Sequence, residues 1–253
     1  MIMGRRDNRY GNAIYLQGIA KSMFDLYVVT DRSLSRGLTD SQVAELAFVG
    51  GADAVQLRMK GADGREMLEE AKAIRRIADE YCRFFIVNDR VDVAIASGAD
   101  GVHLGQKDIP VRVAREMMGD DALIGTSVSS LDEALKAVED GADYLGVGSV
   151  FRTSTKKDAN QAIGLGTVFE ISHAVDKPVV AIGGINRGNI QDVIKAGADA
   201  AAVVSAAVDQ DDVKEAVHEL KDLILKVRPH VPLDDMGTSL RKKLMFRPSL
   251  SIF

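Results

Sequence analysis

Residues 143–158 read D-Y-L-G-V-G-S-V-F-R-T-S-T-K-K-D and join two chemically different halves. The first half is a short apolar run with glycines at Gly146 and Gly148, which is typical of a buried strand whose backbone is closely approached. The second half, from Arg152 to Lys157, consists of hydroxyl and cationic side chains. Phosphate requires N–H groups, hydroxyl donors and positive charge at one point. The stretch therefore predicts a strand that leads into a phosphate-binding loop, with a solvated turn as the plainer alternative.

Short apolar segments alternate with amphipathic segments along most of the chain. Strands are expected at residues 26–30, 53–58, 84–89, 101–105, 122–127, 143–148, 178–183 and 200–205. Helices are expected at residues 40–49, 66–81, from 91, from 110, at 131–139, 168–175, 190–195 and 213–227. Apolar strands that alternate with helices indicate a parallel sheet covered by helices.

A weak internal repeat, Gly-Ala-Asp, marks four of the predicted helix-to-strand junctions. Its copies lie at residues 51–53, 98–100, 141–143 and 197–199. In each copy the glycine can end a helix in the left-handed conformation, and a strand then begins. Eight strand–helix units in about 200 residues favour an α/β fold of the closed (β/α)8 TIM barrel type, with an open doubly wound sheet as the alternative.

The length and composition suit one large domain. The chain has 253 residues, of which 46% are hydrophobic and 27% are charged, and no Pro- or Ser-rich linker divides the repeating units. We therefore expect a single catalytic barrel domain over residues 23–228. Residues 1–22 are expected to form an arm or a leading helix, and residues 229–253 a tail whose role the sequence does not assign.

Charge and cysteine content exclude several classes of protein. A formal net charge of −5 argues against a nucleic-acid surface and suits local basic loops that hold small phosphorylated molecules. No apolar run approaches about 18 residues, so neither a secretory signal nor a membrane contact is expected. The single cysteine, Cys82, excludes an internal disulfide and fits a reducing, cytoplasmic compartment. A homo-oligomer remains open.

Polar residues gather at the C-terminal ends of the predicted strands, where (β/α)8 enzymes place their active sites. At the end of the second strand, side-chain alternation directs Gln56, Arg58 and Lys60 to one side. Similar polar ends are Asn88-Asp89-Arg90, Gly105-Gln106-Lys107-Asp108 and Thr126-Ser127. The sequence therefore predicts one mouth that carries amides, cations and carboxylates.

Glycines and small residues end the last two strands. Gly183, Gly184, Val204 and Ser205 offer backbone N–H groups at the position where these barrels commonly bind phosphate. A pair of glycines after a strand is also typical of a simple tight turn. Both readings remain open from these residues alone.

Asp89 and Asp108 are two carboxylates next to a group of cations. Paired carboxylates among Lys and Arg suit Mg²⁺ that is held jointly with a substrate diphosphate. Each aspartate could instead cap the helix that follows it. Helix caps do not require Arg58, Lys60 and Lys156 nearby, so the combination favours the metal site.

Other kinds of catalytic centre find little support. His103 lies within an apolar strand, which favours a buried histidine with satisfied hydrogen bonds over a general base. The chain has no Cys/His set with zinc spacing and no arrangement of nucleophile, histidine and acid. None of the predicted strand interiors carries a lysine, which disfavours a Schiff-base aldolase.

With these residues assembled, the chain resembles the thiamine-phosphate synthase family from about residue 26 to residue 225. The resemblance depends on segments that are specific only together and in this order: Gln56-Leu57-Arg58-Met59-Lys60, Asn88-Asp89-Arg90, Gly101 to Asp108, Thr153-Ser154-Thr155-Lys156-Lys157, Gly183-Gly184-Ile185 and Val204-Ser205.

The resemblance implies a (β/α)8 transferase of thiamine biosynthesis. Such an enzyme joins 4-amino-2-methyl-5-(diphosphooxymethyl)pyrimidine to hydroxyethylthiazole phosphate, giving thiamine phosphate and diphosphate. It implies that Gln56, Leu57, Arg58, Met59, Lys60, Asn88, Ser127 and Lys156 hold the pyrimidine diphosphate, with Arg58, Ser127 and Lys156 as the catalytic residues. It implies that Thr153, Ser154, Thr155, Gly183, Gly184, Val204 and Ser205 hold the thiazole phosphate. Mg²⁺ would be bound by Asp89 and Asp108.

This chemistry explains why no catalytic triad is present. When diphosphate leaves, the aminopyrimidine ring stabilises the cation that remains. The protein then needs charge neutralisation on the diphosphate and a thiazole nitrogen held in line, rather than a strong base. Mg²⁺ would serve as Lewis acid and template.

Two alternatives are kept. A similar thiazole tautomerase typically has a histidine after the fifth strand and lacks the aspartate pair. Here Ser129 stands at that position and both aspartates are present, which favours the synthase. The other alternative is a sensor on the same barrel that binds phosphorylated ligands without turnover.

Overall fold

The computed structural model describes residues 23–153 and 162–228. The predicted arm at 1–22 and tail at 229–253 lie outside the described residues. The strands are β1 Leu26–Val29, β2 Ala54–Leu57, β3 Phe84–Asn88, β4 Gly101–Leu104, β5 Leu123–Val128, β6 Tyr144–Gly148, β7 Val179–Ile182 and β8 Ala200–Val203. The helices are α1 Asp40–Val49, α2 Gly64–Glu80, α3 Val91–Ser97, α4 Val111–Met118, α5 Leu131–Glu139, α6 Gly164–Ala174, α7 Ile190–Lys195, α8 Ser205–Val208 and α9 Val213–Val227.

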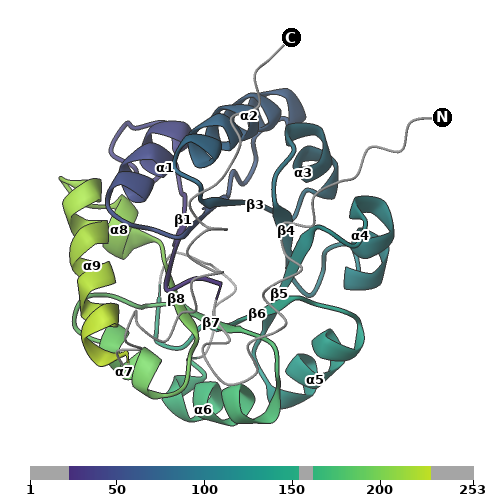
Figure 1. Ribbon diagram of the computed structural model, residues 1–253, viewed down its shortest axis with the longest axis vertical. Coiled ribbons are helices and arrows are strands. Elements are labelled where there is room, and N and C mark those ends of the chain that lie inside the picture. The colour runs from purple at the N-terminus through teal and green to yellow at the C-terminus, as the bar shows by residue number, and fades with distance from the viewer. Residues whose placement is uncertain (1–22, 154–161, 229–253) are drawn as a thin grey trace, which may run out of the picture.

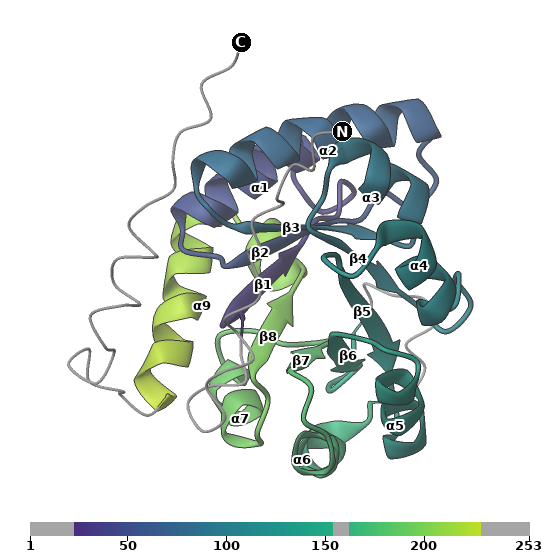
Figure 2. The same ribbon diagram turned by 45° about the vertical axis from the view of Figure 1, so that its right-hand side comes forward.

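The strands form a closed parallel barrel in sequence order, and β8 pairs with β1 to complete it. Figure 1 shows the ring of strands inside a ring of helices, and Figure 2 shows the same arrangement after a turn of 45°. The predicted TIM barrel is therefore confirmed, and the open doubly wound sheet is wrong.

Several predicted helix boundaries shift. Helix α2 begins at Gly64 because the Asp63 side chain accepts hydrogen bonds from the backbone N–H groups of Arg65 and Glu66. Helix α6 begins at Gly164, four residues before the predicted start at Val168. The short helix α8 was not expected as a separate element.

Apolar side chains pack on both sides of the sheet. Outside the barrel, strand residues such as Leu57 and Val87 pack against the helices. Inside it, aromatic side chains share the space with small ones. The inner cluster consists of Phe24, Tyr27, Ala54, Ile86, Leu123, Tyr144, Val180, Ala200 and Ala202. This interior is a packed core, as is usual for an eight-stranded barrel.

The Gly-Ala-Asp repeat has a structural role at the N-terminal ends of the strands. The glycines have φ values of 102°, 69°, 90° and 98°, as the helix-ending interpretation requires. Each aspartate lies just before an even-numbered strand, and its carboxylate accepts the backbone N–H at the start of the preceding odd-numbered strand. These bonds join Asp53 to Leu26 (3.1 Å), Asp100 to Phe85 (2.8 Å), Asp143 to Ile124 (2.8 Å) and Asp199 to Val179 (2.9 Å).

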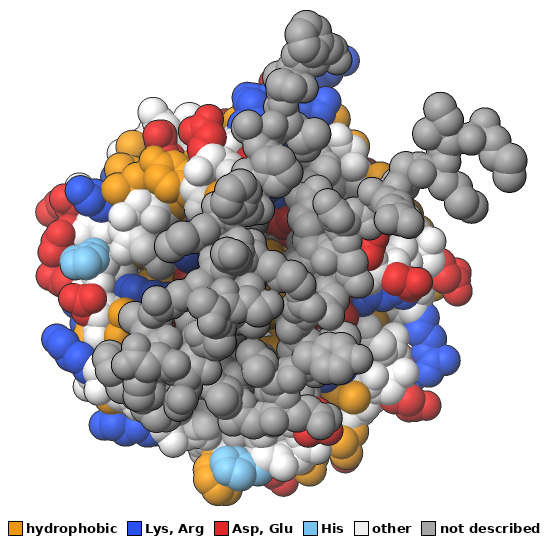
Figure 3. All heavy atoms as spheres, viewed as in Figure 1, with side chains coloured by type: hydrophobic (Ala, Val, Ile, Leu, Met, Phe, Trp, Pro, Cys, Tyr) orange, Lys and Arg blue, Asp and Glu red, His pale blue; other side chains and the backbone are white. Residues whose placement is uncertain are grey.

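The face of the molecule in Figure 3 carries both acidic and basic side chains. In the view of Figure 3, acidic and basic side chains alternate around the rim formed by the helices, and neither sign gathers on one side. In the described part of the chain, no helix is both long enough and apolar enough to cross a membrane.

Candidate active site

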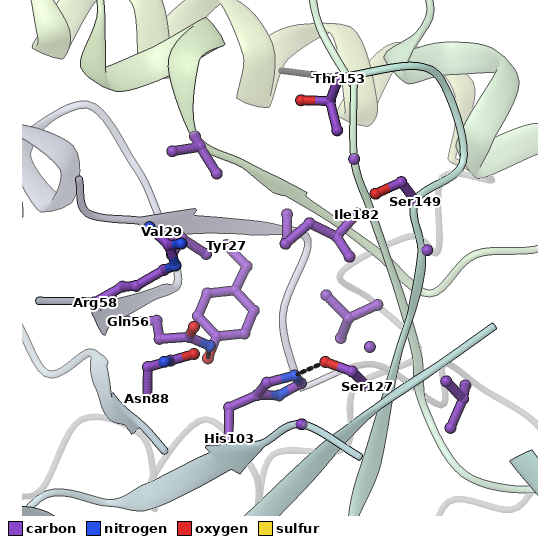
Figure 4. A pocket seen from close by; sticks show the side chains of 18 of the residues that line it. Tyr27, Val29, Gln56, Arg58, Asn88, His103, Ser127, Ser149, Thr153 and Ile182 are labelled. Carbon is purple, nitrogen blue, oxygen red and sulfur yellow. Dashed lines mark hydrogen bonds between the residues drawn. The ribbon is translucent and has the colours of Figure 1, made fainter. Parts of the chain in front are cut away.

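A pocket of about 670 Å³ opens at the C-terminal ends of the strands. Figure 4 shows Arg58, Gln56 and Asn88 on one side of it and Ser149 and Thr153 on the other. Of the residues predicted for the site, its lining includes Gln56, Arg58, Lys60, Asn88, Asp89, Asp108, Ser127, Thr153, Gly183, Gly184, Val204 and Ser205. The sequence pattern therefore identified residues that the fold does bring together.

The end of β2 follows the predicted alternation. Gln56, Arg58 and Lys60 line the pocket. Leu57 is fully buried and packs with Met59 in the layer between sheet and helices. The side chains of Leu57 and Met59 therefore do not belong to the pocket, because successive strand residues point to opposite faces.

Arg58 is held by a residue that the sequence did not indicate. Its Nη1 atom donates to Oδ2 of Asp31 at 2.8 Å, and its backbone N–H donates to Oγ1 of Thr30 at 3.2 Å. The other oxygen of Asp31 accepts from the backbone and side chain of Ser33. Asp31 follows directly after β1, and this position at a strand end was the only sequence signal.

The two predicted metal ligands lie next to each other. Lys60 donates from Nζ to Oδ2 of Asp89 at 2.6 Å. The pKa of Asp108 is raised, first by burial and then by the neighbouring carboxyl group of Asp89, with Lys60 acting in the opposite direction. Two carboxylates that repel each other beside a cation form a suitable donor set for a divalent metal. The residues present therefore fit Mg²⁺.

Neither aspartate caps a helix. Helix α3 begins after Arg90 and helix α4 after Pro110, and neither has a side-chain cap. Asp108 instead accepts the backbone N–H of Gly105 at 2.6 Å. The cap alternative is therefore wrong for both aspartates. Within residues 23–153 and 162–228, no group of three or more His, Cys, Asp or Glu side chains could hold a metal, so any ion here would need ligands from substrate or water.

The opposite side of the pocket is formed by the loops after β6, β7 and β8. Gly183 and Gly184 have φ values of 102° and 66°. An added Cβ would lie 2.5 Å from Ser149 at the first glycine and 2.7 Å from the carbonyl oxygen of Arg152 at the second. These close approaches require glycine and bring the β6 and β7 loops together. Ser149 was missed because it lies inside an apolar run. Ser154, Thr155 and Lys156 lie outside the described residues.

A row of polar side chains crosses the floor of the pocket. Its members are Gln56, Tyr27, Tyr144, His103 and Ser127, each hydrogen-bonded to the next. His103 is satisfied as predicted, but it also lines the pocket, which the interpretation as a core residue did not include. Both tyrosines were missed because, in the sequence, a tyrosine within an apolar run looks like a residue of the hydrophobic core.

Four further polar residues lie at the pocket: Gln106, Lys107, Ser129 and Glu133. Gln106 donates from Nε2 to the backbone oxygen of Ser127 at 2.6 Å, which ties the β4 loop to β5. Glu133 accepts from the Oγ of Ser129 at 2.9 Å. Ser129 occupies the position at which a tautomerase is expected to have a histidine. Its hydroxyl group is hydrogen-bonded to Glu133 of the helix that follows it, α5.

A closed (β/α)8 barrel with cations, paired carboxylates and a glycine-rich cradle at one mouth defines an enzyme that acts on phosphorylated small molecules. A family model described as "Thiamine monophosphate synthase" matches residues 26–207. The thiamine-phosphate synthase of Methanoculleus marisnigri is 51% identical over 201 residues, which cover 79% of this chain and 95% of that protein. That of Chloroflexus aurantiacus is 54% identical over 199 residues, covering 79% and 92%.

A solved structure of the same family is similar to this chain. Thiamine phosphate pyrophosphorylase from Pyrococcus furiosus has a TM-score of 0.77 and 46% sequence identity, covering 82% of this chain and 98% of that one. The chain belongs to the thiamine-phosphate synthase family and is a transferase. The resemblance inferred from the sequence motifs is confirmed, and the relatives favour the synthase over the tautomerase and the sensor.

Proposed function

We propose that this chain binds the pyrimidine diphosphate and the thiazole phosphate at opposite sides of one pocket and joins them, releasing diphosphate. The observation that carries the proposal is a division of the pocket into two sides, and Figure 4 shows Arg58 and Asn88 on one side and Ser149 and Thr153 on the other. Cations and carboxylates occupy the side formed by β2, β3 and β4, whereas hydroxyl groups and bare backbone lie on the side formed by β6, β7 and β8.

Arg58 and Lys60 neutralise the diphosphate on the first side. Arg58 is fixed by Asp31, so its guanidinium needs little reorganisation when an anion binds. Lys60 is exposed and pairs with Asp89, so it can turn toward the substrate. Asn88 supplies an amide at the same side, and Gln56 lies deeper, on the floor.

Asp89 and Asp108 would hold Mg²⁺ next to this diphosphate. When bound, Mg²⁺ supplies Lewis-acid stabilisation of the charge that develops on the leaving diphosphate. The carboxylate of Asp89 also keeps Lys60 at the pocket while no substrate is bound, through their 2.6 Å contact.

The second side is suited to the thiazole phosphate. Thr153 offers a hydroxyl group. The segments that begin at Gly183 and Val204 line the pocket with backbone and small side chains. Such a cradle binds a phosphate dianion through N–H and O–H donors. With both substrates bound at fixed sites, the thiazole nitrogen can be held in line with the pyrimidine methylene carbon, which replaces a bimolecular encounter by an oriented one. Of the residues outside the described ranges, Ser154 and Thr155 are proposed to bind the thiazole phosphate as well, and Lys156 is proposed to bind the pyrimidine diphosphate.

The test is a discontinuous assay of the purified chain with both substrates and Mg²⁺, with thiamine phosphate and diphosphate measured together. We expect the two products in equal amounts, and no diphosphate when the thiazole phosphate is omitted. Ligand binding by calorimetry without either product would support the sensor instead. Conversion of a thiazole carboxylate phosphate tautomer without diphosphate release would support the tautomerase.

A further inference from the structure

Five side chains form a continuous row of hydrogen bonds across the inside of the barrel. Nε2 of Gln56 donates to the hydroxyl oxygen of Tyr27 at 2.9 Å, and this oxygen lies 3.1 Å from the hydroxyl oxygen of Tyr144. The Tyr144 oxygen lies 3.1 Å from Nδ1 of His103, and Nε2 of His103 lies 3.0 Å from Oγ of Ser127. The row begins on β2 and ends on β5 at the pocket.

The direction of these bonds follows from the number of protons that the two tyrosine hydroxyl groups can donate. A tyrosine hydroxyl group has one proton to donate. The amide nitrogen of Gln56 cannot accept, so the proton of the fully buried Tyr27 must go to the oxygen of Tyr144. The Tyr144 oxygen accepts this bond, and its own proton must then go to Nδ1 of His103.

The same reasoning continues through the imidazole ring to the serine. Because Nδ1 of His103 accepts, the proton of the neutral ring is on Nε2 and points at Oγ of Ser127. Ser127 accepts this bond, and its own hydroxyl proton is left to point elsewhere. Ser127 lines the pocket, as Figure 4 shows, so its proton is available to a ligand.

We infer that Tyr27 and Tyr144 are positioning residues: they hold His103 as its Nε2–H tautomer and thereby keep Ser127 as a hydrogen-bond donor toward the substrate. This inference rests on the proposed function. The acceptor would be an oxygen of the pyrimidine diphosphate, whose negative charge increases as it leaves. With the opposite direction of bonds, Ser127 would give its proton to His103 and present only lone pairs to an anion.

Two glycines indicate that the barrel is built around this row. An added Cβ at Gly125 would lie 2.0 Å from Cζ of Tyr144, and one at Gly146 would lie 2.7 Å from Cε1 of His103. The rings therefore occupy space that any other residue at those positions would fill. Burial also raises the pKa of both Tyr27 and Tyr144, so both phenols keep the protons on which the direction depends.

The first test reads the tautomer directly and needs no activity. Side-chain ¹⁵N NMR of the full chain distinguishes a protonated from an unprotonated ring nitrogen, and a His103→Gln variant assigns the signals among the four histidines. We expect Nε2–H for His103 in the chain without ligands. An Nδ1–H tautomer would mean that the three bonds from Tyr27 to Ser127 run the other way, and it would overturn the inference.

The second test uses Tyr144→Phe and Tyr27→Phe, with Tyr81→Phe as the control. Tyr81 is 38% exposed and stacks on Phe48 outside the barrel. We expect Tyr144→Phe to give a mixture of both tautomers and to lower kcat about tenfold, with KM for the pyrimidine diphosphate changed less than about threefold, because the lost interaction strengthens as charge develops. Tyr81→Phe should change neither the tautomer nor kcat.

A folded Tyr144→Phe chain with the wild-type tautomer and wild-type kcat would overturn the inference. If that variant does not fold, Tyr27→Phe decides in the same way, and if neither folds, the tautomer of the unaltered chain decides. A chain without turnover of the two substrates would contradict the proposed function, and the NMR result would still be read independently of it.

Discussion

Asp31 holds Arg58 in the pocket through a contact of 2.8 Å between Oδ2 and Nη1, and both side chains are largely buried. The contact engages Nη1 of a guanidinium group whose side chain lines the pocket. We expect Asp31→Asn to raise KM for the pyrimidine diphosphate by about tenfold, because the largely buried guanidinium of Arg58 loses the partner that orients it. Steady-state kinetics over both substrates would check this.

Asp211→Asn serves as the matched control, since Asp211 pairs with Arg36 at the surface and its side chain is 96% exposed. It should leave both KM values unchanged. Unchanged kinetics in Asp31→Asn would show that Arg58 needs no orienting partner.

The aspartate pair predicts that replacing one aspartate lowers turnover without lowering stability. If Asp89 and Asp108 hold Mg²⁺, Asp108→Ala should lose nearly all turnover, yet unfold at the same or a higher temperature in the absence of metal, because a repulsion is removed. Mg²⁺ at about 100 times its Kd should stabilise the unaltered chain by about 2.7 kcal/mol and the variant hardly at all. Thermal melts with and without Mg²⁺, beside steady-state rates, measure both effects.

Asp92→Asn is the control for that experiment. Asp92 pairs with Arg90 and is 62% exposed. It should retain the Mg²⁺-dependent shift. An early-melting Asp108→Ala chain that turns over at a near-normal rate would show that the metal assignment is wrong.

Gly125 and Gly166 should respond in opposite ways to the same change. A Cβ at Gly125 would overlap the ring of Tyr144, so Gly125→Ala is expected to cost about 3 kcal/mol or to repack the barrel interior. An added Cβ at Gly166 in helix α6 would have no neighbour within 4 Å among residues 23–153 and 162–228, so Gly166→Ala should stabilise by roughly 0.5 kcal/mol. Urea unfolding of both variants provides the comparison, and equal effects would contradict the packing argument.

Asp40 predicts a dependence of stability on pH. Burial raises the pKa of this carboxyl group, although Thr30 and Arg32 act in the opposite direction. Between the ordinary pKa and the raised one, the folded state binds more protons than the unfolded state, so this group's contribution to stability falls as pH rises through that window. Asp40→Asn should remove this slope. Urea unfolding between about pH 3.5 and pH 7 would measure it, and an unchanged profile would contradict the assignment.

The periodic part of the fold was open to prediction because it depends on local pattern. The two-residue alternation of a strand placed Gln56, Arg58 and Lys60 on one side, and these residues line the pocket. The same alternation directs the side chains of Leu57 and Met59 away from the pocket, into the core. The barrel order follows from short parallel connections, which leave few other topologies.

The unpredicted part depends on contacts between distant segments. Tyr27 and Tyr144 are 117 positions apart, and nothing near either residue indicates a polar partner. Gly125 resembles any strand glycine until the ring that it accommodates is seen. Asp31 required the position of Arg58 to be known before its role could be recognised.

The four carboxylates of the Gly-Ala-Asp repeat join the strands in pairs, β1 with β2, β3 with β4, β5 with β6 and β7 with β8. The barrel is thus a ring of four two-stranded modules, and none of these four bonds crosses the boundary between β4 and β5. Asp120 and Asp121 are exposed in the loop at that boundary, on the side away from the pocket. Two half-barrels divided between them would each retain two complete modules, so all four bonds of the repeat would survive a division of the chain at this loop.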